Sequence, residues 1–157
     1  MVEQVRSLFR IEATQNIRSA PIQSARPART LIAVFPTAAE LAANFAIRKE
    51  FTKQSQLRAP FVDSLLVWAN GLQGKIQRLL LPITKGRTRL ENLKELQKLA
   101  LKVNKTRNGI AHQGAFCDGE EAKAVIEDAR KFIEGLVLHY EPDFELVDQD
   151  VKRKERR

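Results

Sequence analysis

The sequence has little of the chemistry that metals and disulfides require. Cys117 is the only cysteine among 157 residues, and the two histidines, His112 and His139, lie far apart in the chain. A single cysteine excludes an internal disulfide and favours a reducing, cytoplasmic setting. One cysteine and two separated histidines also give no zinc-type ligand cluster. We therefore expect an activity without a metal or other cofactor.

Long apolar runs are also missing. No run approaches the ~20 residues that span a bilayer, and no hydrophobic stretch of a signal peptide opens the chain, so we expect no membrane association. The composition, 43% apolar and 29% charged, is that of a soluble globular protein. The net charge is +8, with basic stretches at 1–60, 61–118 and 151–157 around an acidic one at 119–150. This balance favours a polyanion such as nucleic acid, and an ordinary solvated basic surface is the alternative interpretation.

The apolar pattern predicts an all-α protein, an antiparallel bundle of four to five helices after a less regular N-terminal segment. Residues 1–35 form that segment and fit either a helix or a strand. Within it, residues 19–29 hold two prolines and several small residues, which indicates a linker, and residues 30–35 are a short apolar run. We expect the bundle to occupy residues 36–141 and a charged tail to occupy residues 142–157.

Helix start signals recur along the predicted bundle. Capping boxes stand at Thr37 to Glu40 and Thr88 to Glu91, Pro60 suits a first helical turn, and Asp118 can cap the last helix. The second helix is expected to be continuous, with Phe61, Leu65, Leu72, Ile76, Leu79 and Leu80 facing inward. The last helix has the strongest periodicity, with these residues inward: Ala122, Val125, Ile126, Ala129, Phe132, Ile133, Leu136, Val137 and Tyr140.

The third predicted helix carries an unusual residue on its apolar seam. The inward positions Leu93, Leu96, Ala100, Val103, Arg107 and Ile110 follow a 3-4-3-4-3 spacing, which gives Arg107 a core position. A buried guanidinium needs a carboxylate, a polar cleft or an interface. Asn104, Asn108 and His112 form a polar line beside the seam. Arg107 and His112 differ by roughly 140° around a regular helix, so they share a face only if the helix unwinds near Gly109 or Gly114.

The segment from Arg107 to His112, "RNGIAH", resembles the Arg-x4–6-His motif of HEPN domains, in which a polar residue follows the arginine. Its place, at the end of a long helix before a final amphipathic helix, is similar too. The resemblance covers residues 37–140 by architecture and residues 107–112 by motif. It implies a HEPN-like bundle.

The resemblance also implies a metal-independent endoribonuclease, in which the RNA 2′-OH attacks the adjacent phosphate. His112 would be the general acid or base, Arg107 would hold the scissile phosphate, and Asn108 would contact the phosphate or orient His112. Two copies of the motif would face each other in a homodimer, in a toxin–antitoxin or antiviral system with a neutralising partner. The residues expected to guide RNA are Lys102, Lys105, Asn104, Arg87 and Arg89. The alternatives are a HEPN-like RNA-binding or protein-interaction module without catalysis, and an unrelated helical domain.

The remaining polar and aromatic candidates have mainly structural interpretations. We expect His139 to cap carbonyls at the end of the last helix, and Cys117 to be no nucleophile. Trp68 fits the core or an interface, with a base-stacking platform as the alternative. As partners of Arg107, the sequence offers Asp63, Glu50 and Asn70.

Overall fold

The computed structural model describes residues 3–5, 25–54, 57–85, 92–113 and 119–146. These residues are mostly helical and contain no strand, which confirms the all-α class. The elements are α2 (Ala25–Gln54), α3 (Ala59–Trp68), α4 (Gly71–Lys75), the π-helical segment η1 (Ile76–Leu80), α5 (Leu81–Thr84), α6 (Leu93–Gln113) and α7 (Gly119–Val137).

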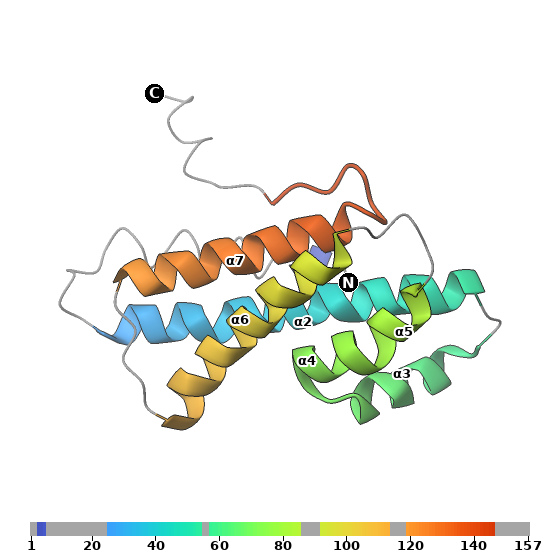
Figure 1. Cartoon of the computed structure of the whole chain (residues 1–157), viewed down its shortest axis with the longest axis horizontal. Coiled ribbons are helices and arrows are strands. Elements are labelled where there is room, and N and C mark those ends of the chain that lie inside the picture. The colour runs from blue at the N-terminus through green and yellow to red at the C-terminus, as the bar shows by residue number, and fades with distance from the viewer. Residues whose placement is uncertain (1–2, 6–24, 55–56, 86–91, 114–118, 147–157) are drawn as a thin grey trace.

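The helical segments alternate in direction along the chain (Figure 1). α4, η1 and α5 follow one another without a break and form a single rod, so the order is α2, α3, this rod, α6 and α7. Because consecutive segments are antiparallel, the first and the last, α2 and α7, run in the same direction. They have the most extensive contacts in the fold, and α6 crosses both (Figure 1).

The core lies between α2, α6 and α7 and extends to the buried sides of α3, α4 and η1. Five alanines of α2 are fully buried and let the neighbouring helices approach closely: Ala38, Ala39, Ala42, Ala43 and Ala46. The inward residues predicted for α7 are buried except Ile126 and Tyr140, which are partly buried. Glu120 and Glu121 lie in the first turn of α7, where the helix dipole favours negative charge. Periodicity therefore predicted this helix correctly.

The N-terminal predictions need correction. α2 begins at Ala25, so residues 25–29 are helix rather than linker. Residues 30–35, for which helix and strand were both open, are helix, and the boundary expected at 35/36 falls inside α2. Thr37 lies in mid-helix, so its capping box is not a helix start. Pro36 costs one backbone hydrogen bond, but it is buried next to Phe35, which packs with the core of α6 and α7. Tertiary packing therefore outweighs the tendency of Pro36 to break a helix. The predictions for residues 19–24, for Thr88 to Glu91 and for Asp118 lie outside the described residues.

The C-terminal boundary also moves. Phe144 and Leu146 are buried in the main core, although the charged tail was predicted from residue 142. Arg130 of α7 donates a hydrogen bond from Nη2 to the backbone oxygen of Leu146, at 3.3 Å. The folded unit therefore includes residues 142–146, because both apolar side chains of "DFEL" are buried in the core.

The second predicted helix is in fact two antiparallel segments. Pro60 lies in the first turn of α3 as expected, but α3 ends at Trp68, and the chain turns at Asn70 (φ 23°) and Gly71 (φ 71°). Asn-Gly is a strong turn signal because both residues tolerate positive φ. α3 buries only Val62 and Leu66, and this leaves Phe61 and Trp68, both predicted to be inward or at an interface, more than half exposed.

No helix in the described ranges is both long enough and apolar enough to cross a membrane.

Candidate functional site

The α6 seam is buried along its first half and exposed at Arg107. Leu93, Leu96, Ala100 and Val103 are buried as predicted, whereas Arg107 is exposed, so its predicted core position is wrong. The reason is that α6 crosses its neighbours obliquely, and its C-terminal end projects beyond α2 (Figure 1). The arginine has the angular position of a core residue, but none of the helices in the described ranges covers it there.

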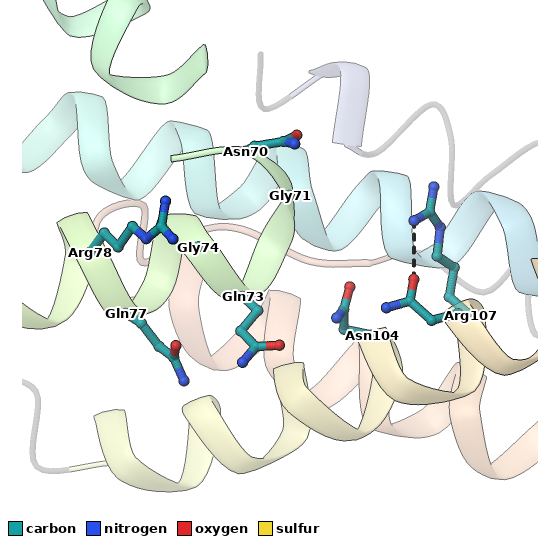
Figure 2. A pocket seen from close by; sticks show the side chains of 9 residues that line it. Asn70, Gly71, Gln73, Gly74, Gln77, Arg78, Asn104 and Arg107 are labelled. Atoms are coloured by element: carbon teal, nitrogen blue, oxygen red, sulfur yellow. Dashed lines mark hydrogen bonds between the residues drawn. The ribbon is translucent and has the colours of Figure 1, made fainter. Parts of the chain in front are cut away.

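A polar groove with a volume of about 440 Å³ lies beside Arg107. We use this name for the space lined by Asn70, Gly71, Gln73, Gly74, Gln77, Arg78, Asn104, Arg107 and Asn108. One wall is α6 and the other is the start of the α4–η1 rod. Figure 2 shows the side chains of Gln73 and Asn104 between the two arginines. Five side-chain amides and two guanidinium groups therefore line the space, with no carboxylate and no apolar side chain among them.

The turn between α3 and α4 builds the second wall. A Cβ atom on Gly74 would lie 1.7 Å from the backbone oxygen of Ala69, so only glycine lets α4 start this close to the end of α3. Gln73 and Gln77 are four residues apart, as are Gly74 and Arg78, so each pair shares one side of the rod. The close turn thus directs a row of amides and one arginine toward α6.

The charges of the groove are not neutralised internally. Within the described ranges, no ion pair to a carboxylate is found for Arg78 or Arg107. The Nη1 atom of Arg107 donates a hydrogen bond to Oδ1 of Asn108 at 3.2 Å (Figure 2). Arg78 lies over the ring of Trp68, with its guanidinium carbon 5.3 Å from the ring centroid. Two guanidinium groups and several amide donors suit an oxyanion such as phosphate.

The predicted site residues divide into three groups. Asn104, Arg107 and Asn108 line the groove together. Lys102 instead pairs with Asp128 of α7 at 2.6 Å, and Lys105 is exposed but does not line the groove. Arg87, Arg89 and the side chain of His112 lie outside what the structure describes, as does Cys117.

The backbone of α6 stays α-helical through Gln113, so the unwinding that would bring positions 107 and 112 together is not observed. On a regular helix these positions remain about 140° apart. A reaction that needs the side chains of residues 107 and 112 at one phosphate must therefore take one of them from a second copy of the chain.

The three residues suggested as partners of Arg107 lie in different parts of the structure. Asn70 shares the groove with Arg107, whereas Asp63 pairs with Arg48. Glu50 is buried and accepts a hydrogen bond from the hydroxyl of Tyr140 at 3.0 Å. His139 packs edge-to-face against Tyr140, with ring centroids 4.8 Å apart.

The sequence interpretation missed the second wall of the groove, formed by Gln73, Gln77 and Arg78. The available signals were the Asn-Gly turn, which reverses the chain, and the four-residue spacing of the glutamines. Neither signal shows which helix the row will face, because that depends on packing between distant parts of the chain.

The fold and the groove define a class: an all-α protein with a polar groove suited to anions. No family model, curated protein or solved structure matches this chain. Among the described residues, no group of three or more histidine, cysteine, aspartate or glutamate side chains is placed to hold a metal ion. The groove itself is therefore the basis for a functional proposal.

Proposed function

We propose that this protein binds RNA through the polar groove and cleaves it as a metal-independent endoribonuclease of HEPN type. The observation that carries the proposal is the lining of the groove: two arginines without carboxylate partners in the described structure, and five amides. A phosphodiester offers the matching oxygens, and Arg107 is able to donate two parallel hydrogen bonds to it. Asn108, bonded to Arg107, orients the guanidinium group.

The chemistry uses a nucleophile that RNA supplies. The 2′-OH loses its proton to a base and attacks the neighbouring phosphorus. The bond to the 5′-oxygen of the next nucleotide breaks, and this oxygen takes a proton, so the products are a 2′,3′-cyclic phosphate and a 5′-hydroxyl end. His112 is the proposed acid or base, since an imidazole with a pKa near 6.5 exchanges protons at neutral pH. Arg107 stabilises the charge that develops on the phosphate.

The regular course of α6 makes a homodimer part of this proposal. Positions 107 and 112 of one chain lie on different sides of the helix, so His112 of a second copy is proposed to complete the site. The HEPN resemblance of "RNGIAH" supports two motifs facing each other across a shared cleft. A toxin–antitoxin or antiviral role in the cytoplasm, with a neutralising partner protein, remains the biological setting that the resemblance suggests.

A non-catalytic RNA-binding module is the second candidate. The observation that favours it is the same regular helix, because a single chain holds Arg107 without bringing residue 112 to the same side. Such a module needs the groove and Arg107 but not His112. The two candidates therefore differ in whether His112 is required.

Cleavage and binding assays on four chains separate these candidates: wild type, His112→Ala, Arg107→Gln and Lys98→Gln. Lys98 is a matched control because it is exposed on α6 and does not line the groove. For a nuclease, we expect RNA cleavage in EDTA with cyclic phosphate ends, lost in the first two variants and retained in Lys98→Gln. Binding without cleavage by wild type, His112→Ala and Lys98→Gln, with weaker binding by Arg107→Gln, would support the module.

The salt dependence of binding tests the groove itself. Removing one phosphate contact with Arg107→Gln should lower the slope of log Kd against log salt by about one. Equal binding by wild type and Arg107→Gln at all salt concentrations would remove both candidates.

A further inference from the structure

Trp68 is a large aromatic side chain left in solvent next to the polar groove. It is 59% exposed at the C-terminal end of α3, although tryptophan usually buries most of its surface. The side chain of Arg78, which lines the groove, lies over its ring at 5.3 Å. One arginine thus contacts the tryptophan on one side and the anion-binding space on the other.

The tryptophan ends an apolar stripe along α3. Phe61, Leu65 and Trp68 recur at intervals of four and three residues, and all but the partly buried Leu65 are exposed. Trp68 contacts Arg78, which lines the groove. A ligand that contacted both the ring of Trp68 and the polar groove would need a flat apolar face and a negative charge a short distance from it.

A nucleotide has both features, because each base has a π-face and each link carries a phosphate. Stacking on an aromatic ring requires an unpaired, accessible base, and bases inside a duplex are already stacked on their neighbours. A cation beside the ring adds attraction for the base and for the phosphate. The combination therefore selects single strands over duplexes.

We propose that Trp68 and Arg78 form a base-stacking platform at one end of the polar groove, and that the groove takes single-stranded RNA. The phosphates lie along Arg78 and Arg107, and one base stacks on the exposed face of Trp68. This inference rests on the proposed RNA binding and adds the class of RNA and the residue that selects it.

Trp68 is the only tryptophan in the chain, so intrinsic fluorescence reports on this position alone. The full chain is titrated with three end-labelled probes whose 2′-oxygens are methylated to prevent cleavage: a single-stranded octamer, the same octamer with abasic sites, and a duplex. Label anisotropy measures binding, and tryptophan emission measures stacking. We expect the single strand to quench the emission, the abasic strand to bind without quenching, and the duplex to bind more weakly.

Substitutions provide the second readout. Trp68→Ala should weaken single-strand binding about tenfold, as expected for the loss of one stacked base, and leave abasic binding unchanged. Trp68→Phe should recover part of the loss, because an aromatic face remains. Val67→Ala is the matched control: Val67 is the adjacent residue and 79% exposed, but it is off the stripe. Its binding should equal that of wild type.

The outcomes distinguish this inference from the proposed function. If the single strand binds without quenching, and Trp68→Ala binds as wild type does, the platform is wrong while RNA binding stands. Equal quenching by the duplex would overturn the selection of single strands. Emission that changes with protein concentration instead of RNA would identify the stripe as a protein contact. If no probe binds, RNA binding fails, and the platform with it.

Discussion

Replacing Gly74 by alanine tests whether the groove is built as described. The new Cβ would lie 1.7 Å from the oxygen of Ala69 and 2.9 Å from its carbonyl carbon, where ordinary contacts begin at 3.4 Å. Backbone atoms cannot rotate away as a side chain does, so α4 must shift by more than about an ångström, and such overpacking costs about 1–3 kcal/mol. Alanine recovers about 1 kcal/mol of helix propensity. Because the new Cβ meets backbone atoms, the cost should lie at the upper end of that range, so the net loss should be about 2 kcal/mol, a fall in Tm of about 4–8 °C for a chain of this size.

Gly135→Ala is the matched control for this substitution. Gly135 lies within α7, and a Cβ there would lie 2.8 Å from Cδ2 of Leu96, the flexible end of a side chain. Leu96 can adjust its rotamer, so the steric cost and the gain in helix propensity should nearly cancel, and the change should stay within about 1 kcal/mol. Urea and thermal unfolding followed by circular dichroism at 222 nm measure both variants. A Gly74→Ala chain as stable as Gly135→Ala would refute the close backbone contact.

Four further substitutions test the ion pair between Lys75 and Glu40, the turn at Asn70 and the C-terminal boundary. Glu40→Gln leaves the buried ammonium of Lys75 without its carboxylate, so it should lower the free energy of unfolding in urea by about 2 kcal/mol. Lys75→Met should lower it by less, because the carboxylate of Glu40 that remains is partly exposed to water. Asn70→Gly should raise Tm by relieving the positive φ, while weakening RNA binding through loss of one amide; equal binding would exclude Asn70 from the site. Phe144→Ala should cost about 3 kcal/mol if residue 144 belongs to the core, and almost nothing if it belongs to a solvated tail.

Periodicity correctly predicted the helices whose apolar side is set by residues close together in the sequence. The stripe of α7 from Ala122 to Val137 and the first half of the α6 seam are buried as expected, because 3.6-residue spacing fixes which side of a helix is apolar. The ends of the helices were harder to predict from the sequence. Pro36 stands inside a helix, since the energy of burying the alanines that follow it exceeds the local cost of proline.

Arg107 illustrates what periodicity leaves undetermined. The heptad pattern gives the angular position of a residue around its helix but not the point along the axis where the partner helix ends. Arg107 faces the same direction as Ala100, as predicted, yet it lies past the covered part of α6. Of the three surroundings expected for Arg107, a carboxylate, a polar cleft or an interface, the structure shows a polar groove. The predicted angular position was correct, and the predicted burial was wrong.

The second wall of the groove depends on contacts that no local pattern encodes. Gln73 and Asn104 are far apart in sequence, and they share a groove only because the Asn70–Gly71 turn reverses the chain and α6 crosses in front of the rod. A single-sequence interpretation detects the turn and the two polar rows separately. Bringing the rows together requires the packing of α4 against α6, which follows from the apolar residues on their other sides.

The position of the groove on the α6 seam gives a physical reason for its chemistry. The same face of the helix that buries Leu96 and Ala100 continues into Asn104 and Arg107, so the groove continues the crevice that the core fills elsewhere. Where apolar residues line that crevice, side chains of other helices close it. Where amides and guanidinium groups line it, closing it with protein would bury charge at high cost, so the crevice stays open to solvent. An anion that entered this space would satisfy its donors, and this is the physical basis of the function proposed for the end of α6.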